Sequence, residues 1–537
     1  VGKTFQSYKY EIWRILEYAF KVENCFQLNW LTLWGHDKMA LLISDMNCAT
    51  GRRAKSEAKW NGLQAMLNSC KEDPLVEIDN LTPESYMSFL QSIRNNDGSF
   101  LKAKAYRAKV SALYHLFRCH PGLEGYPPGF EEQLKTLRTG FLRLVIEKRA
   151  EDGEFNDDGG KKPMTCELYR ALAKWFLMSG TAEDLFAYCF LVLTWNLMCR
   201  ANNTVRICLS HMMWGEDAYI IHFAQQKGDQ MGLTERFPRH LYANPYDYVV
   251  CPFFALGVYL ATFGTQVGAN SPLFCGKAQC KQFSDRMQVI LAEHEDEVIA
   301  MGYATISEVG THSARKGSTK WLCGQPGGPS AMSICIRGGW TLGGVKDVYM
   351  TYLAEGDHFC GRMLALLPLL HANFAASPPS FKQQNCTMAE IYDSVKLVFP
   401  AFDPRGAMAG ILQHCLATLV YQWDKIANLP LTHYCRQCIP LFHDADLLEK
   451  LRNDVEVVHP WDDRGDGNGV NFGSGIPPHI ALLVSQQVII KDMEDFMSGF
   501  DNQMHRIFDE RNVNGGISAA RMQEIVGKLR NGLRESI

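Results

Sequence analysis

Length, composition and charge limit the possible classes of protein. The chain has 537 residues, 47% hydrophobic and 21% charged, which excludes a disordered or collagen-like protein and fits about three or four globular domains. Its net charge is −4, but the charge is uneven. Lys and Arg outnumber Asp and Glu by four in 41–150 and by four in 311–340, whereas acids are in excess by six in 441–537. The basic middle of the chain is therefore compatible with a nucleic-acid partner.

The sequence gives no sign of export or of a membrane span. Residues 1–25 mix charged and aromatic side chains without a compact apolar core. The most apolar run, Leu185–Cys199, is too short to cross a bilayer and predicts a buried helix. Eighteen cysteines are scattered along the chain, so we expect reduced thiols in an intracellular, nuclear protein that does not act in a membrane.

The first third of the chain predicts helices. Residues 1–44 are expected to form an N-terminal helical arm and residues 45–150 a helical domain. Within that domain Thr82, followed by proline, is expected to cap a helix. A second helix is expected over Lys102–Arg118, where basic side chains accompany an apolar face. The acidic, glycine-rich stretch 151–162 is typical of a linker.

The rest of the chain predicts a mainly α fold with a small β-sheet. In segment 163–365 the patterns predict helices over 165–179, 183–199, 252–262, 283–293, 315–323, 328–336 and 343–353, and strands over 219–223 and 233–237. Segment 381–537 is again expected to be helical. Its helix Val484–Arg511 has apolar residues in a three-and-four rhythm, which fits either core packing or an oligomer seam.

One ordered set of residues suits the exchange of DNA phosphodiester bonds. Such chemistry needs a nucleophile, cations for the non-bridging oxygens and a proton donor for the leaving oxygen. Arginine binds phosphate with a planar, permanently charged fork, and tyrosine, lysine and histidine can fill the other roles. In chain order the candidates are Arg200, Lys227, His312, Arg315, Trp340 and Tyr349.

The spacing of these residues carries more information than their types. Lys227 follows a short predicted strand, His312-x-x-Arg315 opens a predicted helix, and Tyr349 lies nine residues after Trp340. Taken singly, each is more often an ordinary surface or core residue.

The ordered set resembles the catalytic signature of tyrosine recombinases, the integrase superfamily, over roughly 45–365. The long flanks are most similar to eukaryotic recombinases of mobile elements of the Crypton type. The resemblance implies a two-lobed DNA clamp: a core-binding domain at 45–150, a catalytic domain at 163–365, and a helical C-terminal domain at 381–537 available for oligomerisation. It also implies a dimer or tetramer on double-stranded recombination sites, with no cofactor or metal.

The resemblance also assigns roles. Tyr349 attacks phosphorus and leaves a 3′-phosphotyrosine, Arg200 and Arg315 hold the phosphate, and Lys227 protonates the leaving 5′ oxygen. His312 assists proton transfer. Trp340 packs near the nucleophile and donates its indole N–H.

Two departures from the family pattern leave alternatives open. An acidic residue usually stands three positions after the first arginine, where this chain has Asn203, and Tyr352 is a second candidate nucleophile. A catalytically inactive DNA-binding protein, a type IB topoisomerase and a structural scaffold are therefore rival functions.

Two further clusters were weighed for ligand binding. Eight basic residues are expected to contact DNA phosphates, although a solvated face is the simpler explanation: Arg52, Arg53, Lys55, Lys59, Lys102, Lys104, Arg107 and Lys109. His433, Cys435 and Cys438, with His443 nearby, could bind zinc, but their cramped spacing favours buried thiols.

Overall fold

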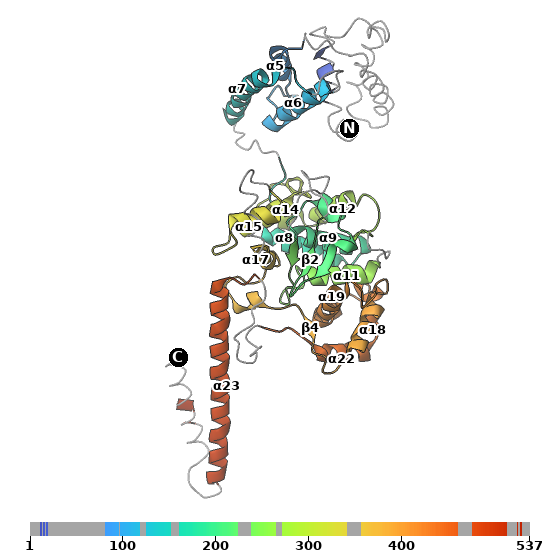
Figure 1. Ribbon diagram of the computed structural model, residues 1–537, viewed down its shortest axis with the longest axis vertical. Helices are drawn as coiled ribbons and strands as arrows, with labels where there is room; N and C mark the ends of the chain where they lie inside the picture. The colour runs from blue at the N-terminus through green and yellow to red at the C-terminus, as the bar shows by residue number, and fades with distance from the viewer. Residues whose placement is uncertain are drawn as a thin grey trace. The chain divides into compact units, whose positions relative to one another are not determined.

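The computed structural model (Figure 1) divides into two units, residues 1–160 and residues 161–537. The described residues are 11–12, 14–16, 18–19, 81–95, 97–118, 125–151, 160–223, 238–264, 271–340, 356–459, 475–512, 524 and 527–528, with the backbone alone for 500–512. The described parts are mainly helical with small antiparallel sheets, which confirms the predicted fold class.

In the described part of the first unit, helices pack around an aromatic core. They are α5 (Pro83–Ser92), α6 (Ala103–Arg118) and α7 (Phe130–Glu151). As predicted, Thr82 caps α5, where its hydroxyl accepts a hydrogen bond from the N–H of Ser85 at 3.1 Å. The rings of Tyr106 and Phe141 meet edge to face at 5.0 Å between centroids and join α6 to α7. Ile12, from the N-terminal segment, is fully buried in the same core.

The second unit contains most of the helices. Up to residue 364 they are α8 (Cys166–Ser179), α9 (Ala182–Asn196), α10 (Ala201–Val205), α11 (Pro252–Phe263), α12 (Gln279–Glu293), α13 (Glu295–Ala300), α14 (Ser313–Cys323), α15 (Ala331–Gly338) and α17 (Gly356–Leu364). Further on are α18 (Met388–Val398), α19 (Ala409–Tyr421), α20 (Trp423–Ala427), α21 (Tyr434–Cys438), α22 (Ala445–Asp454) and α23 (Pro478–Asn512). Short 3-10 turns are η3 (Leu209–His211), η4 (Ile306–Glu308), η6 (Ala372–Ala375) and η7 (Pro440–His443).

Helix α9 is the centre of this unit. Every residue from Asp184 to Asn196 is buried, so the apolar run forms the predicted buried helix. The helix ends at Asn196, three residues before the predicted end at 199. Helix α11 packs between α9 and α19 (Figure 1). One continuous hydrophobic core extends from Met164 to Val484, so segments 163–365 and 381–459 share a single interior.

The sheets are short. Strands β1 (Met212–Trp214), β2 (Tyr219–Ile221) and β3 (Arg239–Leu241) form an antiparallel sheet in that order, and β4 (Ser380–Phe381) pairs with β5 (Val455–Glu456). In this register Ile220 faces both Met213 and His240. The predicted strand 219–223 is present in shortened form, and the predicted strand 233–237 lies outside the described residues.

Among the described side chains of the long helix α23, those up to 499, only the ones near its start are fully buried. Ile480 and Val484 are fully buried and the helix contacts η6, whereas Leu482, Ile489 and Phe496 are more than half exposed. Within the described parts of the chain, no helix combines the length and hydrophobicity of a membrane span. The described cysteines are free thiols.

Candidate phosphate-binding site

Arg200 stands at a sharp turn after the central helix. Met198, just past the end of α9, adopts a left-handed backbone with φ +47°, and Arg200 is the N-cap residue of α10. Thr204 fixes the turn, because its hydroxyl lies 2.9 Å from that of Thr194 and 3.1 Å from the Cys199 sulfur. The Arg200 side chain is half-buried, and the backbone that carries it is held in place by the contacts of Thr204 with Thr194 and Cys199.

Arg315 lies in the first turn of α14, which is locked against the chain before α8. The carbonyl of Ser313 accepts a hydrogen bond from the N–H of Met164 at 3.0 Å. Gly317 approaches the same segment so closely that a Cβ atom there would lie 2.0 Å from the Met164 carbonyl oxygen. From this fixed helix, Nη2 of Arg315 donates to the carbonyl of Gly338 at 2.5 Å.

Trp340 folds back over the end of α15. Gly339 adopts a left-handed backbone with φ +61°, and the N–H of Trp340 donates to the carbonyl of Cys335 at 3.0 Å, which is a Schellman ending. The indole covers Gly338, where a Cβ would lie 2.9 Å from the ring. The guanidinium carbon of Arg315 is 5.4 Å from the ring centroid, within the range of a cation–π contact.

Arg200 and Arg315 are close enough to influence each other. Burial, and then the charge of Arg200, lower the pKa of Arg315 from 12.5 to about 10, so the guanidinium is still charged at neutral pH. Among the described side chains, no carboxylate lies within ion-pair distance of either arginine. Two neighbouring cations without a counter-charge form a site suited to an anion with several acceptor oxygens.

The other predicted site residues have mixed positions. His312 is exposed and immediately precedes α14, in the same turn as Arg315. The structure thus gathers Arg200, Arg315 and Trp340, with His312 beside them in sequence. Lys227, Tyr349, Tyr352, Arg52, Arg53, Lys55 and Lys59 lie outside the described residues.

The basic face of α6 differs from the prediction at one position. Lys102, Lys104 and Arg107 are exposed, as phosphate contacts must be. Lys109 is only 1% exposed, and its ammonium forms an ion pair with Glu11 at 2.7 Å. The prediction that Lys109 contacts DNA is therefore wrong, because its position on the helix turns it into the core.

Sequence reasoning missed a buried ion pair behind the site. Arg337 is fully buried and donates to Asp357 at 2.6 Å and to the carbonyl of Asn196, the last residue of α9, at 2.7 Å. Burial acts to raise the pKa of Asp357, but the charge of Arg337 and the hydrogen bonds of His240 outweigh it and hold that pKa well below its usual range. Arg337 belongs to the acid-free stretch 311–340, which was a signal, whereas nothing in the sequence marked Asp357.

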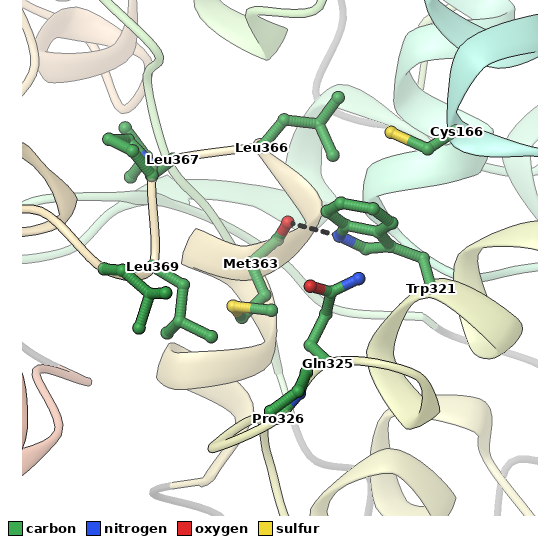
Figure 2. A pocket seen from close by; sticks show the side chains of 10 residues that line it. Cys166, Trp321, Gln325, Pro326, Met363, Leu366, Leu367 and Leu369 are labelled. Carbon is green, nitrogen blue, oxygen red and sulfur yellow. Dashed lines mark hydrogen bonds between the residues drawn. The ribbon is translucent and has the colours of Figure 1, made fainter.

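A separate cavity of about 360 Å³ lies beside α14 and α17 (Figure 2). Figure 2 shows Trp321 at its edge, where the indole N–H donates to the carbonyl of Met363 at 3.1 Å. All of its lining residues are uncharged, among them Cys166, Gln325 and Leu369. The cavity therefore lacks the cations that a phosphate group requires.

The histidine–cysteine cluster has a structural role. His433 donates from Nε2 to the carbonyl of Leu177 at 2.7 Å and accepts from the N–H of Cys435 at Nδ1, at 3.3 Å. Both ring nitrogens are thus used in joining α21 to the end of α8. Among the described residues no cluster of His, Cys, Asp or Glu could hold a metal ion.

Comparisons with known proteins give weak structural similarity and no match in sequence. No protein-family model matches the chain, and no curated protein matches it in sequence. Among solved structures, the chain is similar to one titled "Flpe-Holliday Junction Complex", with 10% sequence identity and a TM-score of 0.35, over 71% of this chain and 97% of that chain. A likeness of that size carries no argument about activity, so any function has to be argued from the site itself.

Proposed function

We propose that the chain is a DNA strand transferase of the tyrosine-recombinase type. The observation that carries the proposal is the convergence of Arg200 and Arg315, which are far apart in sequence, at one place where no described side chain offers a carboxylate partner. A scissile phosphate would supply the missing negative charge and accept hydrogen bonds from both guanidinium groups.

The proposed reaction exchanges one phosphodiester for another. The Tyr349 hydroxyl attacks phosphorus and gives its proton to His312, the bond from phosphorus to the 5′ oxygen breaks, and Lys227 donates a proton to that oxygen. The products are a 3′-phosphotyrosine and a free 5′-hydroxyl. Attack by another 5′-hydroxyl reverses the step and rejoins a strand, so the energy of the broken bond is retained and no ATP is consumed.

The described residues would stabilise the charge that develops during this step. Arg200 and Arg315 would neutralise the non-bridging oxygens, and the Gly338 carbonyl would hold Arg315 in orientation. The Trp340 indole, partly exposed beside Arg315, can donate one hydrogen bond to a phosphate oxygen. His312, at the start of α14, would assist proton transfer.

The wider proposal concerns partners and setting. Double-stranded recombination sites would be the substrate, with the exposed Lys102, Lys104 and Arg107 on phosphates. The exposed apolar side chains of α23 would join copies into a dimer or tetramer. The activity would serve integration or excision of a mobile element in the nucleus.

One observation favours a second candidate, a DNA-binding protein without catalysis. Asn203 is buried in α10 close to Arg200, and its neutral amide stands where the family pattern expects an acid. Such a protein would keep the arginine pair for phosphate binding and would lack strand transfer.

A covalent trap separates the two functions. A pool of nicked duplexes of random sequence, whose cleaved fragment diffuses away, is incubated with the full-length protein and analysed in denaturing detergent. We expect an adduct that mass spectrometry maps to Tyr349, lost in Tyr349→Phe and retained in Tyr352→Phe. DNA binding in gel-shift assays without any adduct would favour the non-catalytic protein.

A further inference from the structure

We propose that Arg337, Asp357 and His240 form a positioning network that orients both phosphate-binding arginines. The inference rests on the proposed function and deepens it. None of the three touches the phosphate site in the role proposed here. Arg337 acts through backbone groups that precede Arg200 or contact Arg315, and Asp357 and His240 act by holding Arg337.

Arg337 links three elements at the end of the central helix. Its Nη2 donates to the carbonyl of Asn196 at 2.7 Å and to that of His240 at 3.0 Å. Its Nη1 donates to the carboxylate of Asp357 at 2.6 Å and to the Asp357 carbonyl at 3.1 Å. Since Asn196 stands four residues before Arg200, this side chain fixes the turn that carries Arg200.

The same residue is coupled to the second phosphate ligand. Gly338 follows Arg337 directly, and its carbonyl accepts the hydrogen bond from Arg315. A neighbouring arginine supports the same helix end, because Nη1 of Arg239 donates to the carbonyl of Leu197 at 2.7 Å. Buried guanidinium groups thus bind the main-chain carbonyls of Asn196 and Leu197, which precede Arg200, and Arg315 itself binds the carbonyl of Gly338.

Asp357 and His240 keep Arg337 in place. One carboxylate oxygen of Asp357 accepts from both the backbone N–H and Nδ1 of His240, each at 2.9 Å. The His240 ring stacks on His358 at 3.7 Å between centroids, and Nδ1 of His358 lies 2.7 Å from the Tyr242 hydroxyl. The carboxylate is 3% exposed, so its geometry is set entirely by these partners.

The network also accounts for the charge balance. Arg239 is buried within electrostatic range of Arg337 and Arg315, and Arg315 is within range of Arg200. Among the described side chains, Asp357 is the acid that pairs with this group, and it neutralises Arg337. The positive charge of Arg200 and Arg315 is left for the substrate. The supporting acid therefore comes from the start of α17, and a neutral Asn203 is compatible with an intact site.

The test compares His240→Leu, which removes the ring donor to Asp357, with His240→Asn, which can retain a donor near the Nδ1 position. Single-turnover adduct formation is measured on a normal duplex and on one with a methylphosphonate at the scissile position, a neutral group with less need of guanidinium charge. We expect His240→Leu to lose about tenfold or more on the normal duplex, as misplacement of a phosphate ligand predicts. His240→Asn should recover most of that loss, and on the methylphosphonate all three proteins should react within about threefold.

An equal loss on both substrates would overturn the proposal. If His240→Leu does not fold, Tyr242→Phe replaces it, since this variant removes one hydroxyl beside His358 and keeps the ion pair. A smaller loss of adduct formation, confined to the normal duplex, is then expected. If Tyr242→Phe reacts like the wild-type protein on both duplexes, the proposal is overturned.

A wild-type protein that forms no adduct would refute the proposed function and leave the network to be judged by phosphate binding. In that case the rise in melting temperature on adding inorganic phosphate is measured. Its loss in both Arg200→Ala and His240→Leu supports the network, and its loss in Arg200→Ala alone overturns it.

Discussion

Replacing Arg315 by methionine should abolish phosphate binding at little cost in stability. The guanidinium is 8% exposed and lies within range of the positive charge of Arg200. Methionine has a similar length, carries no charge and fills irregular space well. We therefore expect Arg315→Met to fold normally and to lose adduct formation.

Two opposing terms of similar size set the expected stability. The lowering of the Arg315 pKa from 12.5 to about 10 corresponds to roughly 3 kcal/mol against the buried charge. The hydrogen bond from Arg315 to the Gly338 carbonyl, which the variant loses, is worth about 1.5–3 kcal/mol as a bond from a charged donor. The free energy of unfolding of Arg315→Met should therefore lie within about 1–2 kcal/mol of the wild-type value.

Arg337→Met is the matched control, because Arg337 is an equally buried arginine with a carboxylate partner. Its removal leaves Asp357, 3% exposed, without a cation. Breaking a buried pair from one side costs about 3–5 kcal/mol. The two substitutions are chemically identical, so the difference between them reports the partners of each guanidinium, which are a carboxylate and three carbonyls for Arg337 and one carbonyl for Arg315.

Urea titration followed by tryptophan fluorescence, with and without inorganic phosphate, measures both effects. The wild-type midpoint should rise with phosphate, and the Arg315→Met midpoint should not. Arg315 would be a structural arginine, and the reasoning would be refuted, by either of two results. One is a loss of stability in Arg315→Met as large as that in Arg337→Met. The other is a rise of the Arg315→Met midpoint with phosphate equal to that of the wild-type protein.

Three further predictions follow from single sites. Gly317→Ala should lower the free energy of unfolding by about 3 kcal/mol or more, because its Cβ would lie 2.0 Å from the Met164 carbonyl oxygen. As the control, Gly140→Ala at an exposed helix position, where a Cβ has nothing within 4 Å, should raise the free energy of unfolding by about 0.5–1 kcal/mol. Urea titrations measure both changes. The pKa of Asp357 is held below its usual 3.8, so its contribution to stability is complete above that pH and is lost as the pH falls below it; an acid titration followed by circular dichroism should show Asp357→Asn without this loss. Lys109→Ala should destabilise the first unit and leave the salt dependence of DNA binding unchanged, whereas Lys104→Ala should reduce that dependence by about one counterion, as titrations at several salt concentrations would reveal.

Local signals in the sequence predicted several elements well. The apolar run at 185–199 predicted the buried helix α9, because a helix that is apolar on all sides has no stable place outside a core. Thr82 predicted the start of α5, since a threonine before proline satisfies an N–H at a helix end. The placing of Arg200 and Arg315 at one site followed from a family pattern, and no local rule could have supplied it.

What the sequence could not show depends on long-range contacts. Strands β1 and β3 have three residues each, too few for periodicity to identify. The face of α6 that carries Lys109 was assigned to solvent because its partner, Glu11, is remote in sequence. Asp357 is an ordinary acid in the sequence, and its role appears only when α17 packs beside α15 and β3.

The distribution of charge is consistent with the proposed phosphate site in a protein of net charge −4. Desolvating several guanidinium groups together costs free energy that grows with each uncompensated charge. The buried pair of Arg337 and Asp357 removes one of these charges, and carbonyls at the end of α9 accept hydrogen bonds from Arg337 and Arg239. Among the described side chains no carboxylate pairs with Arg200, Arg239 or Arg315. A phosphate bound by Arg200 and Arg315 would offset part of the free energy spent on burying their charge. Asn203, three residues after Arg200, is neutral and adds no negative charge to this group of arginines.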